Sequence, residues 1–124
     1  MTAAFTTFFS KVQNPNFADV FDIDPKELIT KTDEVVMIDV RLPEVYVGEL
    51  GHIDGAKLVV LDTLPERLQE LPKDKTIVFI CLAGGRSARA SAYALQNGFT
   101  SVYNMHGGML SWNELNLPTT KKVN

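Results

Sequence analysis

The run Ile77-Val78-Phe79-Ile80 constrains this chain most, because it ends at the only cysteine, Cys81, and leads through a glycine pair into a helix-forming stretch. A short β-branched and aromatic run without alternation is typical of a parallel strand buried on both faces. The alanine-rich stretch from Ser87 to Leu95 predicts a helix. The pattern therefore predicts a strand, a tight loop and a helix, with Cys81 at the carboxyl end of the strand, where open α/β sheets bind ligands.

The loop between this strand and helix is suited to hold negative charge. The first N–H groups of a helix have no intrahelical acceptor and carry the positive end of the helix dipole. We expect Gly84 and Gly85 to take positive φ angles that turn successive N–H groups toward one point. Arg86 adds a permanent cation. Because thiols at helix starts and beside cations ionise readily, the sequence predicts that Cys81 is a thiolate nucleophile at neutral pH.

The rest of the chain alternates between short apolar runs and helix-forming segments. Asp24 and Pro25 mark one helix start, as an N-cap and a proline at the first helical position, and Glu27 is placed to complete a capping box. Such alternation predicts one α/β domain with three layers, α/β/α, around a parallel sheet. The expected strands are residues 20–23, 34–40, 56–60, 76–80 and 101–104, and the expected helices are residues 24–30, 43–48, 63–71 and 87–97.

Four motifs of this chain resemble those of the rhodanese family of sulfurtransferases. The cysteine loop, from Cys81 to Ser87, matches the family's pattern of cysteine, two variable residues, glycine, one variable residue, arginine and serine. The other matches are Ile38-Asp39-Val40-Arg41, Gly51-His52-Ile53-Asp54-Gly55-Ala56 and Gly107-Gly108-Met109-Leu110-Ser111-Trp112. Together they stand in the family's order over about residues 20–117. The resemblance implies a rhodanese-like fold with a five-stranded parallel sheet in the strand order 1-5-4-2-3.

The same resemblance implies how the chain is divided into segments. We expect residues 1–18 to be an N-terminal extension, residues 19–118 the rhodanese-like domain, and residues 119–124 a polar tail. A length of 124 residues suits a single domain. The extension carries Phe5, Phe8 and Phe9, which could pack on the domain or on a partner, and we expect packing on the chain's own domain.

The resemblance implies a sulfurtransferase with Cys81 as its catalytic residue. A sulfane sulfur would pass from thiosulfate or another persulfide donor to Cys81, and then from the Cys81 persulfide to cyanide or a thiol acceptor. A protein that carries a persulfide could also be a partner, and no cofactor is required. Asp39 and Arg41 would support the loop from behind through an ion pair or hydrogen bonds, and Ser87 would cap the helix while donating to the sulfur. The implied substrate-binding residues, whose N–H groups would surround the transferred sulfur, are Leu82, Ala83, Gly84, Gly85, Arg86 and Ser87.

Two other functions remain open on the same scaffold. Related cell-division-cycle phosphatases have five residues between cysteine and arginine, whereas four separate Cys81 from Arg86, and the shorter loop favours a single sulfur atom over a phosphoryl group. A phosphatase or arsenate reductase is therefore less favoured. The second alternative is a persulfide carrier or regulatory rhodanese module. Leu82 and Ala83 stand where many thiosulfate-using members carry a basic and a polar residue, which leaves the donor open.

Composition narrows the possible partners and location. A net charge of −3 and a pI near 5.3 argue against nucleic acid or an acidic membrane, which need a concentrated basic surface. No run approaches the roughly 18 apolar residues of a membrane span, and the first ten residues lack the positive start of a signal peptide. One cysteine forms no internal disulfide, so a cytoplasmic location is expected. The two histidines and the cysteine lack the spacing of zinc ligands, and we expect no metal site.

Some further residues have structural interpretations. We expect His52 to fix a turn, His106 to be exposed to solvent, and Met109 and Trp112 to lie in the core. Arg89 stands one helical turn after Arg86, and the sequence favours neither of two roles for it. It either reinforces the positive charge at the loop or lies on a solvated helix face.

Overall fold

One mixed sheet of six strands forms the centre of the molecule. A computed structural model describes residues 5–123. The strands β2 to β6 are paired in parallel in the order β2-β6-β5-β3-β4. This order confirms the expected arrangement of five parallel strands. The strands of the sheet are β1 (Val12–Gln13), β2 (Phe21–Ile23), β3 (Val36–Asp39), β4 (Lys57–Leu58), β5 (Ile77–Ile80) and β6 (Val102–Met105).

The sixth strand, β1, is a correction to the expected sheet. It pairs antiparallel with β2 at the edge, with Val12 opposite Asp22 and Gln13 opposite Phe21. The expectation of a wholly parallel, five-stranded sheet is therefore wrong at this edge. Two exposed residues have no periodicity from which a strand could be predicted. They form a strand because β2 offers them an unpaired edge.

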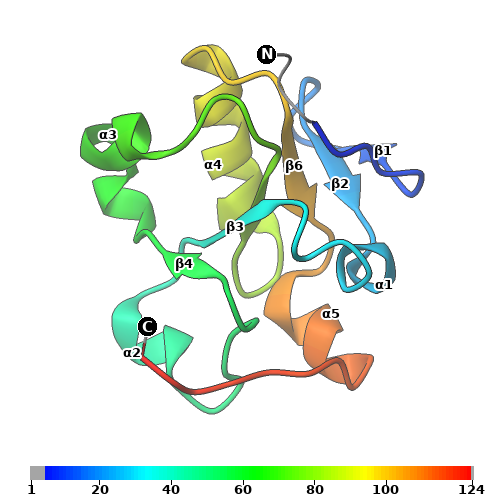
Figure 1. The fold of residues 1–124 in the computed structure, drawn as a ribbon, viewed down its shortest axis with the longest axis vertical. Coiled ribbons are helices and arrows are strands. Elements are labelled where there is room, and N and C mark those ends of the chain that lie inside the picture. The colour runs from blue at the N-terminus through cyan, green and yellow to red at the C-terminus, as the bar shows by residue number, and fades with distance from the viewer. Residues whose placement is uncertain (1–4, 124) are drawn as a thin grey trace.

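Helices cover both faces of the sheet and give the expected three layers (Figure 1). Three of the expected helices are shorter than predicted: the first ends at Leu28, the second ends at Tyr46, and residues 61–70 form one α-helical turn between two 3₁₀ turns. Short helices depend on packing more than on propensity, so their ends are poorly predicted from sequence. The helices are α1 (Pro25–Leu28), α2 (Pro43–Tyr46), α3 (Leu64–Arg67), α4 (Gly85–Gln96) and α5 (Gly108–Glu114), and the 3₁₀ turns are η1 (Leu61–Thr63) and η2 (Leu68–Glu70).

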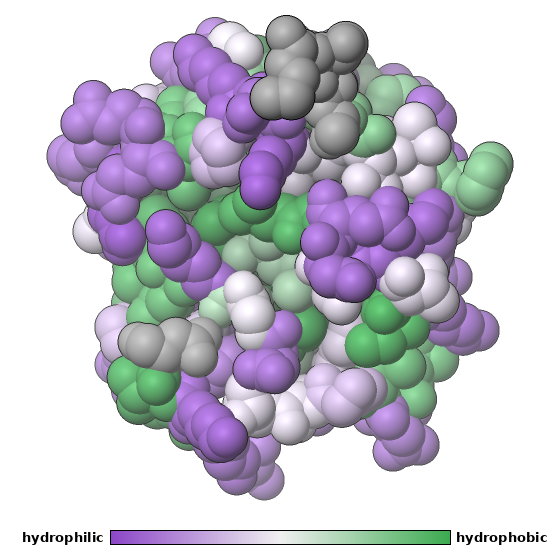
Figure 2. Space-filling view, in the orientation of Figure 1, coloured by the Kyte–Doolittle hydropathy of each residue, from purple (hydrophilic) through white to green (hydrophobic). Residues whose placement is uncertain are grey.

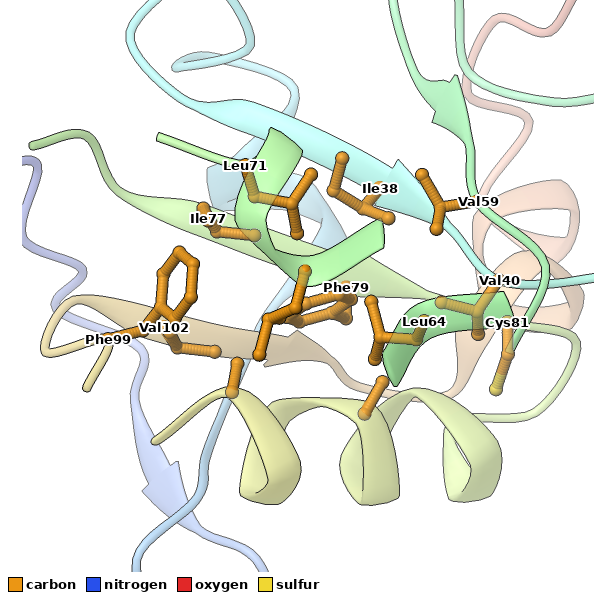
Figure 3. Close-up of a cluster of buried hydrophobic side chains, with 13 residues drawn as sticks. Ile38, Val40, Val59, Leu64, Leu71, Ile77, Phe79, Cys81, Phe99 and Val102 are labelled. Carbon is orange, nitrogen blue, oxygen red and sulfur yellow. The ribbon is translucent and has the colours of Figure 1, made fainter. Parts of the chain in front are cut away.

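Strand β5 separates two apolar clusters, because successive side chains of a strand point to opposite faces. Ile77 and Phe79 belong to the cluster beneath α3 and α4, which Figure 3 shows, and Val78 and Ile80 belong to the cluster beneath α1 and α5. Cys81 follows the alternation of Ile77 and Phe79 and joins the first cluster. The strand thus delivers the cysteine to the face on which α4 begins.

Phe8 anchors the N-terminal segment to the domain. Phe8 is buried and its ring contacts that of Tyr103 edge to face, with centroids 5.0 Å apart. Phe5 and Phe9 are exposed. The expected packing on the chain's own domain is therefore confirmed for Phe8, whereas Phe5 is 45% exposed and Phe9 is 91% exposed.

Glu27 ties this N-terminal segment to α1. Its carboxylate accepts hydrogen bonds from the N–H groups of Phe9 and Ser10, each at 2.9 Å, and forms an ion pair with Lys31 at 2.8 Å. Burial raises the pKa of Glu27, but the hydrogen bonds from Lys31, Ser10 and Phe9 outweigh it and lower the pKa to about 2. Glu27 therefore does not complete the predicted capping box, and the side chain of Asp24 caps α1 without it.

The surface combines hydrophilic and apolar regions. On the face seen in Figure 1, hydrophilic side chains surround a hollow in which apolar side chains are visible near the centre (Figure 2). None of the helices formed by residues 5–123 has the length and apolar composition needed to cross a lipid bilayer.

Candidate active site

Cys81 lies directly after β5, where the loop to α4 begins. Its side chain is 3% exposed, and its sulfur accepts hydrogen bonds from the Gly84 N–H and from the Ser87 hydroxyl, each at 3.1 Å. Figure 3 shows the side chain beside Val40, at the first turn of α4. The sulfur has apolar neighbours on one side and hydrogen-bond donors on the other. Negative charge on the sulfur would therefore be stabilised through the loop.

Gly84 provides the sharp turn from strand to helix. It is the N-cap of α4, has a φ of +103°, and contributes no side chain to the cap. Gly85 has no positive φ; it begins the helix, and a Cβ there would have open space around it. The expectation that both glycines adopt positive φ is therefore wrong for Gly85. One residue in the left-handed region is enough to reverse the chain here.

The first turn of α4 keeps unused donors close to the cysteine. Backbone bonding of the helix begins with the Ala88 N–H, which donates to the Gly84 carbonyl at 3.2 Å. The N–H groups of Gly85, Arg86 and Ser87 consequently have no intrahelical acceptor. Within the described residues, Gly84 is the one member of the expected ring from Leu82 to Ser87 whose N–H donates to the sulfur. The remaining first-turn donors are free to hold an anionic atom.

Ser87 and Asn104 share a hydrogen bond behind the loop. The Ser87 Oγ lies 2.5 Å from Asn104 Oδ1, in addition to its contact with the Cys81 sulfur. Asn104 Nδ2 donates to the Gly84 carbonyl at 3.1 Å and to Asp22 Oδ1 at 2.9 Å, so its amide orientation is determined. Because a hydroxyl has one hydrogen, Ser87 donates either to the sulfur or to Asn104. Ser87 lies inside the first turn, and the expectation that it caps the helix is wrong, since Gly84 holds that position.

Asn104 is a site residue that the sequence analysis missed. It is 1% exposed, and it contacts both residues that donate to the sulfur: its Nδ2 donates to the Gly84 carbonyl, and its Oδ1 lies beside the Ser87 hydroxyl. Its signal in the sequence is an amide inside the apolar run of β6. A buried amide requires hydrogen-bond partners, and the neighbouring strand β5 leads to the cysteine.

The start of α5 holds the opposite side of the cysteine loop. The Met109 N–H donates to the Cys81 carbonyl at 2.9 Å, and the Leu110 N–H donates to the Leu82 carbonyl at 3.0 Å. At Gly108, whose φ is +58°, a Cβ would overlap these two carbonyl groups. Since the C=O and N–H of a trans peptide point in opposite directions, the next two N–H groups of the loop point away from α5. This close approach explains the glycine at the start of α5, Gly108.

Asp39 and Arg41 form the expected ion pair, buried at the carboxyl end of β3. Arg41 Nε donates to Asp39 Oδ1 at 2.9 Å, and Arg41 Nη2 donates to Asp39 Oδ2 and to the Gly51 carbonyl, both at 2.8 Å. In the described part of the chain, neither side chain forms a hydrogen bond with the loop from Cys81 to Ser87. The pair thus joins the end of β3, which neighbours β5, to the turn at Gly51.

A groove of about 750 Å³ runs beside the cysteine loop. Gly85, Arg86 and Arg89 of α4 line it together with Val40 and Leu42, which follow β3. Both arginines are exposed, and neither guanidinium is paired with another group among residues 5–123. Arg89 therefore adds to the positive charge beside the loop. Leu82 is 43% exposed, so the loop itself presents an apolar side chain to solvent.

Comparison with known proteins assigns this fold and site to a family. A family model described as the Rhodanese-like domain matches residues 24–115. The chain belongs to the rhodanese-like domain family. The match includes the cysteine loop, Asn104 and the buried ion pair of this rhodanese-like domain, whereas β1, β2 and the turn between them lie outside it.

Two relatives that match most of this rhodanese-like domain are named sulfurtransferases. A sulfurtransferase of Allochromatium vinosum is 34% identical over 102 residues, which cover 80% of this chain and 94% of the relative. The thiosulfate sulfurtransferase GlpE of Pseudoalteromonas translucida is 35% identical over 86 residues, covering 69% and 79% of the two chains. The crystal structure of a rhodanese-related protein from Thermoplasma volcanium matches with a TM-score of 0.76 at 28% identity, covering 82% of this chain and 98% of that one.

The histidines, Met109 and Trp112 of this rhodanese-like domain lie outside the cysteine loop. His52 is fully buried, stacks on Tyr46 at a centroid distance of 3.5 Å, and its Nδ1 lies 2.7 Å from the Tyr46 carbonyl oxygen. His106 has a 73% exposed side chain, as expected. Met109 and Trp112 are fully buried, which confirms them as core residues. Across residues 5–123, no three His, Cys, Asp or Glu side chains gather as a metal-binding group would require.

Proposed function

We propose that this protein is a sulfurtransferase that carries a sulfane sulfur on Cys81 as a persulfide. The observation that carries the proposal is the position of the Cys81 sulfur, which takes hydrogen bonds from Gly84 and Ser87 at the start of α4. The N–H groups of the next three residues, 85–87, have no acceptor within the helix. A sulfur atom added to Cys81 would extend toward such donors and find its negative charge stabilised there.

The proposed reaction has two displacement steps. The Cys81 thiolate attacks the outer sulfur of thiosulfate, a new S–S bond forms, and the S–S bond of the donor breaks. Sulfite leaves with the electron pair of the broken bond, and Cys81 becomes a persulfide anion. Cyanide or a thiolate then attacks the outer sulfur, and the Cys81 thiolate is released with the electron pair. The two steps require no external oxidant or reductant.

The size of the site supports sulfur over phosphoryl transfer. The Cys81 side chain is 3% exposed, so a donor must present a narrow reacting atom to it. The outer sulfur of thiosulfate or of a persulfide is a single terminal atom. A phosphoryl group brings three oxygens to the reacting centre and needs a wider ring of donors than the short loop from Cys81 to Arg86 provides.

The test is intact-mass measurement after incubation with thiosulfate and removal of excess donor. The wild-type protein is expected to gain about 32 Da on Cys81, as the chemistry of a persulfide requires. Cys81→Ser should gain nothing, and His106→Ala, which changes an exposed side chain outside the loop, should load like the wild type. Loading of Cys81→Ser to the same extent, or no loading of the wild type by thiosulfate or any organic persulfide, would contradict the proposal.

Turnover separates an enzyme from a carrier. An enzyme converts thiosulfate and cyanide to thiocyanate continuously, well beyond one equivalent of protein. A carrier stops at one equivalent and holds its sulfur until a partner accepts it. We expect continuous formation of thiocyanate.

A further inference from the structure

We propose that the groove beside the cysteine loop binds the organic part of a low-molecular-weight persulfide that bears a carboxylate, and that this class of compound is the preferred sulfur donor. The inference rests on the proposed sulfur transfer at Cys81 and names the donor for it.

The dimensions of the groove exceed what thiosulfate needs. Its volume of about 750 Å³ lies in the range of small-molecule sites, which is roughly 300–1,000 Å³. Thiosulfate has five heavy atoms and would leave most of this space to water. The side chains of Phe17, Leu42 and Leu61 line the groove and suit a hydrocarbon chain.

The charges of the groove indicate a carboxylate on that chain. Arg86 and Arg89 lie one helical turn apart on the same wall, and no carboxylate in the described residues forms an ion pair with either. Asp62 also lines the groove but forms no ion pair with either arginine. Guanidinium groups bind carboxylates through paired hydrogen bonds, which makes the site selective for anions.

The turn between β1 and β2 forms part of the groove wall. Asn16 and Phe17 line the groove, and the buried Asn14 places them there. The Asn14 Oδ1 accepts hydrogen bonds from the N–H groups of Asn16 at 2.9 Å and of Phe17 at 3.2 Å. The Asn14 N–H donates to the Val20 carbonyl at 2.8 Å, which closes the turn. The aromatic wall is therefore held by specific bonds.

The same polar network joins this turn to the cysteine loop. The Asn14 Nδ2 donates to Asp22 Oδ1 at 3.0 Å, and Asn104 Nδ2 donates to that same oxygen at 2.9 Å. Asn104 in turn holds Gly84 and Ser87 beside the sulfur. The turn precedes residue 24, where the match to the family model begins. We infer that it selects the donor.

The transfer from such a donor is balanced without a further reactant. The Cys81 thiolate attacks the outer sulfur of R–S–SH, the S–S bond of the donor breaks, and the inner sulfur leaves with the electron pair. The inner sulfur takes up the donor's proton as R–SH, and Cys81 retains the outer sulfur as a persulfide anion.

Two matched donors test the proposal: the persulfides of 3-mercaptopropionate and of cysteamine, which share a two-carbon chain and differ in carrying a carboxylate or an ammonium group. Single-turnover loading of Cys81, followed by mass spectrometry, gives kcat/KM for each. We expect the wild type to prefer the carboxylate donor by about tenfold, as one charge-assisted interaction provides. Arg89→Ala should reduce that ratio to about one. Lys26→Ala removes one exposed positive charge on α1 and should keep the ratio.

Phe17→Ala tests the apolar wall separately. It is expected to lower the ratio of kcat/KM for the carboxylate persulfide to that for thiosulfate by about tenfold, since a lost hydrophobic contact costs that much or more in discrimination. Equal use of the two organic donors by the wild type, an unchanged ratio in Arg89→Ala, or an unchanged ratio in Phe17→Ala would overturn the proposal. Loading of the wild type by thiosulfate would still uphold the general sulfur transfer, so the two failures are distinguishable.

Discussion

Replacing Asp39 by Ala would leave the Arg41 guanidinium buried without its counter-charge. Asp39 is fully buried and Arg41 is 4% exposed, so water cannot substitute for the missing carboxylate. Two side-chain hydrogen bonds at 2.8 and 2.9 Å are lost, and one to the Gly51 carbonyl remains.

The expected cost follows from this geometry. Breaking a buried ion pair by removing one partner costs about 3–5 kcal/mol. A domain of this kind has a free energy of unfolding of roughly 5–15 kcal/mol, so Asp39→Ala removes a large part of it. The melting temperature should fall by about 10–20 °C, since each kcal/mol corresponds to a few degrees at this chain length.

Urea unfolding followed by tryptophan fluorescence is the appropriate assay. Trp112 is the only tryptophan and is fully buried, so its emission reports the loss of the core. Glu70→Ala is the matched control, because Glu70 and Arg67 form an exposed ion pair at 3.3 Å whose loss should cost at most about 1 kcal/mol.

A double variant isolates the cause of the loss. Asp39→Ala combined with Arg41→Met removes both charges and should recover most of the stability, because an uncompensated buried charge is the main cost. The reasoning is refuted if Asp39→Ala costs no more than Glu70→Ala, or if the double variant is as unstable as Asp39→Ala alone.

Three further predictions concern the loop and the N-terminal segment. Gly84→Ala should cost about 1–2 kcal/mol in urea unfolding because of its positive φ, whereas Gly85→Ala should be neutral or stabilising by up to about 1 kcal/mol; equal effects would contradict the assigned turn. Asn104→Ala should slow alkylation of the cysteine by iodoacetamide about tenfold, since the turn at Gly84 loses the bond to its carbonyl that positions it beside the sulfur, and an unchanged rate would count against that role. The pKa of Glu27 is lowered from 4.5 to about 2, so its stabilising contribution is present above pH 4.5 and is lost as the pH falls toward 2. Stability measured between pH 6 and 2 should fall less steeply for Glu27→Gln, and parallel curves for the two proteins would exclude the assignment.

Much of the cysteine loop could be predicted from local sequence. The apolar run of β5, Gly84 and the alanine-rich stretch of α4 specify a strand, a turn and a helix by their own preferences. Those elements place Cys81 at a helix start, which is where the structure has it. The positive φ expected for Gly85 is wrong, because a glycine permits a positive φ without requiring one.

The supporting groups could not be predicted in the same way. Asn104 reaches Gly84 and Ser87 from a strand about 20 residues further along the chain. The edge strand β1 depends on β2 and has no pattern of its own. Glu27 has the spacing of a capping box, yet its carboxylate binds N–H groups 17 and 18 residues earlier. In each case the partner is supplied by a distant segment, about which local spacing carries no information.

The amino-acid sequence by itself determined the position of Cys81 between a strand and a helix, and the order of the parallel strands through the family resemblance. The tertiary structure alone decided which donors reach the sulfur, which amide holds them, and that the turn after β1 forms a wall beside Arg86. The physical reason is that propensity and periodicity act over a few neighbouring residues, whereas burial brings together polar groups far apart in the chain and requires each to find a partner.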